Sequence, residues 1–407
     1  MSKKLNSDPK WQNIYIVNFF ANQKMVKCIN LKSFWFRFIR VGVLNLSKNE
    51  GKNFKMKRKI RLKAIDFFCG AGGVTCGFQQ AGIDVLCGID VDENCKLTYE
   101  KNNDRQFLKI DISDFKKERL KYEFNIERKQ DDLIFVGCSP CQYYSNIKTD
   151  KTKSTETRLL LADFQEIVDY YNPGYVFIEN VPGVRKKKDS PLGKFKDFLI
   201  RKGYSCDDGI INAKYFGVPQ SRRRYILIAS RITEKISLPK PDSENMKTVK
   251  DAIGNYNIFR ELKAGEIDKT KFIHSAAGLS DLNLKRIKNT PKDGGNRCVW
   301  KDDPELQLRC YTDHKGHYDV YGRMYWDKPA PTITTRFSSY SNGRYGHPEQ
   351  DRAISLREGA TLQSFPPDYN FYSGSQATIA KMIGNAVPPK LAERIGESMI
   401  ASFESED

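Results

Sequence analysis

Apolar and polar positions alternate in blocks between residues 60 and 230 of this 407-residue chain. Five apolar runs have the length of β-strands: Ala64–Phe68, Val85–Ile89, Leu133–Val136, Tyr175–Ile178 and Tyr225–Ala229. The segments between them are helix-like, and Thr157–Tyr170 carries apolar residues at helical spacing until Asn172-Pro173-Gly174 ends the pattern. Strands that alternate with helices predict an α/β fold, in which helices cover both faces of a mostly parallel sheet.

The pattern changes beyond residue 232. Residues 233–375 are rich in glycine, proline, short aromatic runs and arginine, and show no strand–helix alternation. Helical periodicity returns in residues 376–407, around Ile379, Leu391 and Ile395. We therefore expect a first domain over residues 56–232, a smaller irregular domain over residues 233–375, and a C-terminal segment that returns to the first domain.

Residues 1–55 form a basic N-terminal extension. Residues 1–62 contain 15 Lys and Arg against two acids, whereas the rest of the chain contains 53 against 48, so most of the net charge of +18 lies at one end. A basic segment suits contact with nucleic acid. Met56 stands just before the first strand-like run, so a dispensable extension ahead of a natural start at Met56 is an equal alternative.

The chain contains no run of 18 apolar residues, which argues against a membrane span. Lys24, Lys27, Arg37 and Arg40 interrupt every N-terminal stretch that could serve as a secretory signal. The ten cysteines show no framework spacing. We therefore expect a cytoplasmic protein with reduced thiols and no membrane contact.

A glycine-rich turn, Asp66–Gly73, follows the first strand-like run and precedes a helix. Such a turn lets a ligand approach the backbone at a helix N-terminus. Asp90 ends the next strand, 20 residues past Gly70, where a carboxylate can accept hydrogen bonds from ribose hydroxyls. With Asp111 and Ile112 after the following apolar run, these residues predict a nucleoside pocket at the carboxyl edge of the sheet. The spacing G-x-G-G favours S-adenosylmethionine over NAD but leaves an NAD-dependent oxidoreductase open.

A candidate nucleophile lies in the stretch Cys138-Ser139-Pro140-Cys141-Gln142, directly after the strand-like run Leu133–Val136. A redox pair, half a zinc site and a buried thiol are the alternatives, although a zinc site needs a second ligand pair. Glu179 follows the next strand, 38 residues after Cys141, which places the two on adjacent parallel strands at one edge. A thiol beside a carboxyl group suits a substrate that is attacked and protonated together.

Three consecutive arginines, Arg222, Arg223 and Arg224, precede the last strand-like run. Alternation along a strand points Arg222 and Arg224 to one side, where two guanidinium groups could fix a base carbonyl or phosphates. A solvated basic patch is the alternative.

Taken in order, the motifs resemble those of the DNA (cytosine-5)-methyltransferase family, bacterial restriction-modification type. The matching stretches span roughly residues 60–400 and are DFFCGAGG (66–73), SPCQ (139–142), ENV (179–181), QSRRR (220–224), RAISLREGATLQSFP (352–366) and IGNAVPP (383–389). The chain departs from the family at Phe67, where Leu is usual, and at Ser139, where Pro is frequent. The resemblance implies a Rossmann-like methyltransferase domain that binds S-adenosyl-L-methionine, with residues 233–375 as a target-recognition domain for duplex DNA.

The resemblance also implies roles for single residues. Cys141 is expected to be the nucleophile, Glu179 to hold the N3 and N4 edge of cytosine, and Arg224 to contact the base carbonyl with Arg222 nearby. The residues expected around the cofactor are Phe68, Gly70, Gly72, Gly73, Asp90, Asp111, Ile112, Leu161 and Asn385. Thiolate addition at C6, with a proton supplied at N3, would let C5 attack the methyl group once the base has left the helix stack.

The irregular region carries arginines that suit contacts to base edges and phosphates. These are Arg297, Arg309, Arg323, Arg336, Arg344 and Arg352. Cys298, Cys310, His314 and His317 match no standard zinc finger, so no metal site is predicted.

Two alternatives keep the fold but change the function: an RNA cytosine-5 methyltransferase and a non-catalytic DNA-binding relative. The long arginine-bearing region favours DNA, and the intact set of Cys141, Glu179 and Arg224 favours an enzyme. The resemblance further implies a monomer, and a cognate restriction endonuclease, where one exists, that acts separately.

Overall fold

The computed structural model describes residues 61–139, 153–183, 190–269, 273–300, 302–308 and 319–405, with the side chains of 153–159 excepted. The basic N-terminal extension therefore lies outside the described residues, as do Cys141, Arg309, Cys310, His314 and His317.

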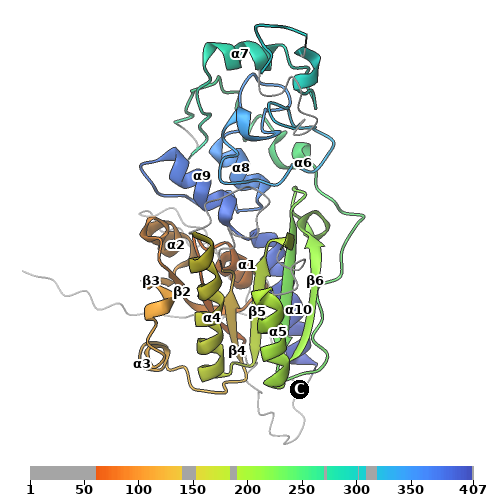
Figure 1. Ribbon diagram of the computed structural model, residues 1–407. Coiled ribbons are helices and arrows are strands. Elements are labelled where there is room, and N and C mark those ends of the chain that lie inside the picture. The colour runs from red at the N-terminus through yellow and green to blue at the C-terminus, as the bar shows by residue number, and fades with distance from the viewer. Residues whose placement is uncertain are drawn as a thin grey trace, which may run out of the picture. The chain divides into compact units, whose positions relative to one another are not determined.

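A seven-stranded sheet in the order β3-β2-β1-β4-β5-β7-β6 forms the framework of the first domain (Figure 1). The strands β1 to β5 pair in parallel, whereas β7 runs antiparallel to both of its neighbours, β5 and β6. The predicted mostly parallel sheet is confirmed. The strands are β1 Lys63–Phe67, β2 Asp84–Asp90, β3 Gln106–Lys109, β4 Leu133–Gly137, β5 Tyr175–Asn180, β6 Ser205–Asn212 and β7 Arg223–Ser230.

The two edge strands, β3 and β6, do not stand out as apolar runs in the sequence. Ser205–Asn212 contains Asp207 and Asp208, and every residue of β6 is only half-buried. An edge strand is stabilised by its ladder to one neighbour, so it needs less apolar side-chain surface than a central strand. Asp208 forms an ion pair with Lys196 at this edge, which is consistent with a charged, half-exposed strand.

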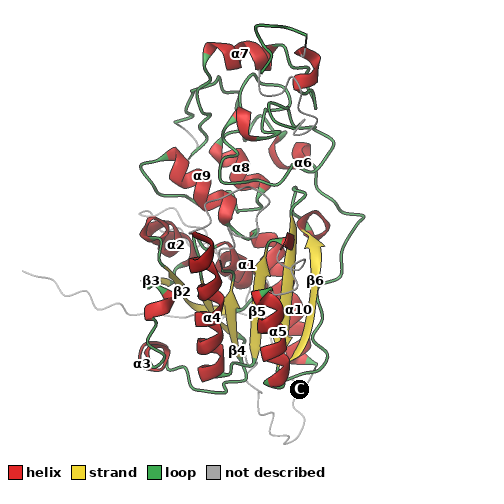
Figure 2. Cartoon of the chain, viewed as in Figure 1, coloured by secondary structure: helices red, strands yellow, loops and turns green. Residues whose placement is uncertain are grey.

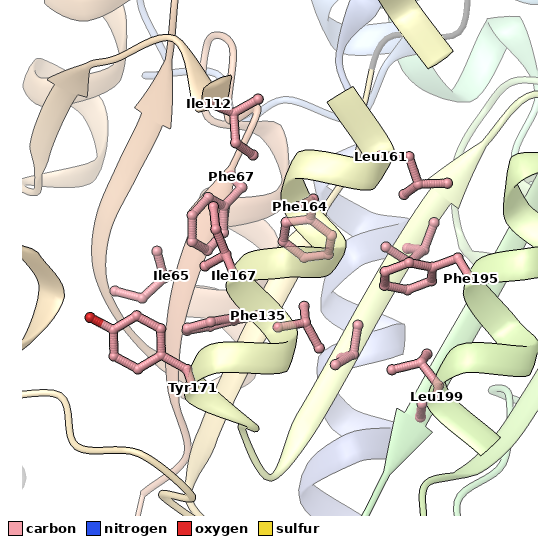
Figure 3. Packing of buried hydrophobic residues seen from close by; sticks show 14 of the residues in the cluster. Ile65, Phe67, Ile112, Phe135, Leu161, Phe164, Ile167, Tyr171, Phe195 and Leu199 are labelled. Atoms are coloured by element: carbon pink, nitrogen blue, oxygen red, sulfur yellow. The ribbon is translucent and has the colours of Figure 1, made fainter. Parts of the chain in front are cut away.

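Helices cover both faces of the sheet, as the cartoon in Figure 2 shows. Alternate strand residues serve the two faces: Phe135 packs into the cluster that contains α4 residues, and Val136 into the cluster that contains α1 and α10 residues. On the α4 side, Phe164 lies edge-on against Phe67 with ring centroids 5.3 Å apart (Figure 3). The helices of this domain are α1 Gly73–Ala81, α2 Lys96–Asn103, α3 Arg119–Phe124, α4 Lys153–Tyr171, α5 Pro191–Arg201 and α10 Pro389–Glu404.

The last helix, α10, returns to the first domain and packs along α1. The approach is close, because a Cβ on Gly77 of α1 would come 2.2 Å from the carbonyl oxygen of Pro389. Gly396 of α10 similarly faces Ala81, with 3.0 Å between an added Cβ and the alanine methyl carbon. One face of the sheet is thus closed by a helix from the far end of the chain.

The region between β7 and α10 contains short helices joined by long irregular segments. Its α-helices in the described residues are α6 Val249–Ile253, α7 Asp281–Lys288, α8 Leu356–Leu362 and α9 Gln376–Asn385. Single 3-10 turns occur in both regions, at Glu93–Cys95, Ile112–Asp114, Ala213–Phe216, Arg297–Trp300 and Tyr340–Asn342. No helix in the described ranges combines the length and apolarity needed to cross a membrane.

Two of the arginines expected to contact DNA are instead fully buried. Arg323 donates to the carbonyl oxygens of Ile287 and Thr290 at 2.8 and 3.0 Å, and also to the main chain near His347. Arg352 makes two 2.7 Å hydrogen bonds to the Glu358 carboxylate. The expectation of DNA contacts is therefore wrong for these two residues, because the donors of Arg323 are used by irregular backbone and those of Arg352 by a buried carboxylate.

Candidate active site

The loop that joins β1 to α1, Phe68–Gly72, is called the glycine loop below. Its backbone turns sharply, with positive φ angles of 60° at Phe68, 50° at Gly70 and 88° at Gly72. The Gly70 N–H donates to Oδ2 of Asp90 at 2.8 Å, and the Cys69 N–H donates to the Ile89 carbonyl at 3.1 Å. The loop is therefore anchored to the carboxyl end of β2.

The three glycines in and after this loop serve different purposes. A Cβ on Gly70 would meet no atom within 4 Å, so Gly70 faces open space that a ligand can approach. A Cβ on Gly72 would come 2.7 Å from the Tyr369 hydroxyl, and one on Gly73 would come 2.3 Å from the Val387 carbonyl oxygen. Gly72 and Gly73 thus permit close packing within the protein.

Asp90 lies at the end of β2 beside the open face of Gly70. Its carboxylate accepts the N–H groups of Gly70 and Asp92, at 2.8 and 2.9 Å. Burial raises the pKa of Asp90, and the two main-chain donors oppose that shift. A carboxylate has about four acceptor positions, so two main-chain bonds leave capacity for ribose hydroxyls.

Apolar residues expected at the cofactor gather in one cluster. Phe68 is half-buried, and its ring lies 6.4 Å from that of Phe164. Ile112 and Leu161, labelled in Figure 3, are each 6% exposed and belong to the cluster on the α4 side of the sheet, against which Phe68 packs. Three separate segments therefore place Phe68, Ile112 and Leu161 on the α4 side of the sheet.

Two polar residues expected near the cofactor are exposed. Asp111 caps the 3-10 turn Ile112–Asp114 by accepting the Ser113 N–H at 3.1 Å. Asn385 ends α9, and the next residue, Ala386, lies 3.2 Å from the position of a Cβ on Gly73. Asn385 is thus brought close to the start of α1.

Glu179 and Arg224 form an ion pair where β5 and β7 run side by side. Arg224 Nε lies 2.7 Å from Glu179 Oε1, and the two side chains are only 13% and 12% exposed. The antiparallel register pairs Glu179 with Ile226, and Arg224, two residues before Ile226, reaches Glu179 diagonally from the same face. A charge-assisted hydrogen bond with little solvent screening holds the carboxylate in one orientation.

Cys138 follows the end of β4 beside this pair. The parallel register of β4 and β5 aligns Val136 with Phe177, so Cys138 and Glu179 occupy corresponding positions past that rung. Burial first, and then the Glu179 carboxylate, raise the pKa of the Cys138 thiol well above its ordinary value. Cys138 therefore stays a thiol, and the predicted nucleophile is Cys141, which lies outside the described residues.

Arg222 has different partners from Arg224. It is buried and donates to the carbonyl oxygens of Ile333, Gly384 and Ala386, at 2.9, 3.0 and 3.1 Å. We expected Arg222 and Arg224 to bind one base together. Arg222 does not fit that expectation, because its hydrogen bonds go to main-chain carbonyl oxygens. Arg222 ties the start of β7 to the segment after α9.

Two glutamines complete this connection and were missed in the sequence. Gln220 donates to Oε1 of Gln363 at 2.6 Å and accepts the Ile333 N–H at 2.8 Å. Gln363 in turn donates to the Ile383 carbonyl at 2.8 Å. Both glutamines are fully buried. Their sequence signal was an uncharged polar residue inside the motifs at 220–224 and 352–366.

Comparison with known proteins decides the family. A profile described as C-5 cytosine-specific DNA methylase matches residues 62–401. The chain belongs to this family. Type II methylase M.HgiDII of Herpetosiphon aurantiacus is 39% identical to the methylase over 344 residues, covering 82% of this chain and 94% of the relative. Type II methyltransferase M1.HphI of Haemophilus parahaemolyticus is 33% identical, covering 83% of this chain and 87% of the relative.

The fold is shared with a crystal structure of a prophage-encoded protein from E. coli. The TM-score is 0.64 at 21% identity, covering 84% of this chain and 99% of that chain. The predicted family and methyltransferase fold are confirmed, and the NAD-dependent oxidoreductase interpretation is excluded by family membership.

Membership of the family sets the reaction and the methyl donor. The methylase transfers a methyl group from S-adenosyl-L-methionine to C5 of cytosine in a specific DNA sequence. Residues in and beside the glycine loop fit this donor. Gly70 leaves open space, Asp90 at the end of β2 keeps acceptor capacity, and Phe68 lies half-buried beside them.

Proposed function

We propose that the methylase modifies one cytosine of a short duplex DNA sequence through a covalent bond between Cys141 and C6 of the flipped base. The observation that carries this proposal is the partly buried Glu179–Arg224 pair at the carboxyl edge, beside the strand that leads to Cys141. A carboxyl group held in place there can donate a proton to a base that a thiolate attacks.

The residues of the chain act in two stages. Glu179 takes up a proton from solvent and donates it to N3 while the Cys141 thiolate forms a bond to C6, so electron density moves to C5. S-adenosyl-L-methionine supplies the methyl group that C5 takes up. Water then takes the C5 proton, the bond between sulfur and C6 breaks as the C5–C6 double bond forms again, and N3 returns its proton to Glu179, which restores the Cys141 thiolate. Arg224 orients Glu179 and contacts the base carbonyl oxygen throughout.

The donor is held by residues from both ends of the chain. Asp90 accepts hydrogen bonds from the ribose hydroxyls, and Phe68 lies against the adenine with Ile112 and Leu161 behind it. Gly70 allows the close approach of the backbone, Asp111 flanks the adenine, and Asn385 reaches the donor from the C-terminal segment. Gly72 and Gly73 support the site by allowing the loop to pack.

The cellular setting follows from the substrate. The methylase acts in the cytoplasm as a monomer on duplex DNA, and a cognate restriction endonuclease acts separately on the same sequence. The names of the type II relatives support a place in a restriction-modification system. Residues 233–375 serve target recognition, with exposed arginines such as Arg336 as the phosphate and base contacts.

The deciding experiment is methyl transfer from labelled S-adenosyl-L-methionine to mixed-sequence duplex DNA, followed by base-resolution mapping of 5-methylcytosine. Incorporation at one short motif is the expected result. Glu179→Gln should lower the rate while Glu127→Gln, a change at an exposed carboxylate, leaves it unaltered. Absence of incorporation by a protein that binds the donor would reject the DNA substrate, and transfer RNA would be the next substrate.

A further inference from the structure

A tyrosine from the C-terminal half of the chain reaches the glycine loop. Tyr369 follows α8, and its phenol is buried against the start of the first domain. The hydroxyl donates to the Ala71 carbonyl oxygen at 2.5 Å and accepts a hydrogen bond from Asn103 Nδ2 at 2.9 Å. Its one donor and its main acceptor site are therefore both used, so the direction of each bond is settled.

The hydroxyl occupies the space that Gly72 leaves by having no side chain. An added Cβ on Gly72 would lie 2.7 Å from the Tyr369 oxygen, at a φ of 88° that already favours glycine. The glycine loop is consequently held from two directions. On the open side, the Asp90 carboxylate accepts a hydrogen bond from the Gly70 N–H. On the buried side, the Tyr369 hydroxyl donates one to the Ala71 carbonyl oxygen.

Tyr369 is itself fixed by bonds to two helices. Arg357 of α8 donates to the Tyr369 carbonyl oxygen at 2.8 Å. Asn102 of α2 exchanges two hydrogen bonds with the main chain of Asn370, at 2.6 and 2.7 Å, and the Tyr372 N–H donates to Thr98 at 2.9 Å. A phenol placed by a rigid segment can impose a position on the loop that it touches.

We infer that Tyr369 is a positioning residue for S-adenosyl-L-methionine. Its hydroxyl holds Ala71 so that Gly70, the adjacent residue, keeps its open face and its bond to Asp90. The residue does not touch the donor; it acts through the loop. The inference rests on the proposed donor site at the glycine loop, and it adds a determinant from a segment far away in the sequence.

Tyr369→Phe removes only the hydroxyl oxygen and is the variant of choice. Binding of S-adenosylhomocysteine, measured by calorimetry on the full chain, should weaken about tenfold, since two buried polar groups lose their partner. The KM for S-adenosyl-L-methionine should rise by a similar factor, while kcat changes by less than about twofold. This split separates loop positioning from a general loss of structure.

Tyr340→Phe is the matched control. Tyr340 is equally buried and its hydroxyl lies 3.1 Å from Thr290 Oγ1, in the same half of the chain but in a cluster without glycine-loop residues. This variant should bind S-adenosylhomocysteine as the unaltered protein does.

The outcomes are distinct. Equal binding by folded Tyr369→Phe and unaltered protein, or equal weakening in Tyr369→Phe and Tyr340→Phe, would overturn the inference. If Tyr369→Phe does not fold, Asn103→Ala removes the partner of the same hydroxyl and should weaken binding about threefold, against no change for Tyr340→Phe. Failure of the unaltered protein to bind S-adenosylhomocysteine would reject the donor site itself, a result separate from either of these.

Discussion

The sheet domain and the irregular region after β7 are stabilised in different ways. The sheet satisfies its own backbone through seven strands, and its interior is almost entirely apolar, with Phe67, Phe135 and Phe164 in contact. The irregular region has no ladder of that kind among its described residues. Its main-chain carbonyls are taken by buried or partly buried arginines, of which the clearest examples are Arg286, Arg323 and Arg344.

Two buried carboxyl groups show the same contrast. Burial raises the pKa of Asp66, in β1, to about 7, although the Thr75 hydroxyl donates to it at 2.7 Å. Burial acts on Glu358 in the same direction, but the Arg352 guanidinium outweighs it and holds the pKa of Glu358 below its usual range. An apolar domain leaves a buried acid without a counter-ion, whereas the arginine-rich region supplies one.

The largest expected effect is on turnover. It tests whether the proposed nucleophile can be removed without loss of the fold. Cys141→Ala should reduce methyl transfer by more than about 10³-fold, because no other group supplies the thiolate. DNA binding, measured by gel shift, should remain. Turnover clearly above background would remove Cys141 from the mechanism, and loss of DNA binding would make it a structural residue.

The next effect should fall on the irregular region. Arg323→Met removes a buried donor from several carbonyl groups and from the Asp351 carboxylate, so the free energy of unfolding should fall by about 3–5 kcal/mol. Arg336→Met, at an exposed arginine, should stay within about 0.5 kcal/mol. Urea unfolding of both variants gives the comparison, and equal stabilities would show that buried arginines do not stabilise this region.

A smaller, pH-dependent effect distinguishes the two carboxyl groups. Because the folded pKa of Asp66 lies above its unfolded value, the folded state binds the proton more tightly, and stability is lost as pH rises toward about 7. Between pH 5 and pH 8, Asp66→Asn should therefore lose less stability than the unaltered protein, by on the order of 2 kcal/mol. Thermal unfolding at the two pH values measures this difference.

Glu358→Gln is the opposite test on the paired carboxylate. Its folded pKa is lowered, so its contribution is present above the unfolded pKa and is lost only in acid. The variant should be less stable than the unaltered protein at both pH 5 and pH 8. A gain at pH 8 would show that the two regions treat buried acids alike.

The smallest effect is expected at the surface. Lys381 of α9 pairs with Asp92 after β2 at 2.8 Å, with the lysine side chain 56% exposed. Lys381→Met should lower the free energy of unfolding by only about 0.2–1 kcal/mol, and less at high salt. A loss as large as that of Arg323→Met would mean that exposed charge pairs, and not buried arginines, dominate the contacts of this part of the chain.

The central strands and the site residues on them were accessible from sequence because their signals are local. Leu133–Val136 and Tyr175–Ile178 are buried on both faces of the sheet and read as continuous apolar runs. The parallel order of these two strands then places Glu179 opposite the end of β4 without further information. The edge strand β6 was not predicted, because its residues are half-buried and mixed in polarity.

The hydrogen-bond partners of long polar side chains could not be predicted from the sequence. Arg222 and Arg224 look equivalent in sequence, yet one binds carbonyl groups of residues 333, 384 and 386, and the other binds Glu179. Likewise, nothing near Arg323 or Arg352 in the sequence indicates burial. A guanidinium group reaches its acceptors through tertiary contacts, and those depend on segments that local pattern does not connect.

By itself, the sequence determined the layers of the fold and the order of the motifs, since strand periodicity, glycine-rich turns and motif spacing are short-range properties. Only the tertiary structure decided which glycine faces a ligand and which one packs, which arginine meets Glu179, and that Tyr369 supports the glycine loop. These outcomes depend on close packing between residues up to about 300 positions apart, and such packing is set by the whole folded chain.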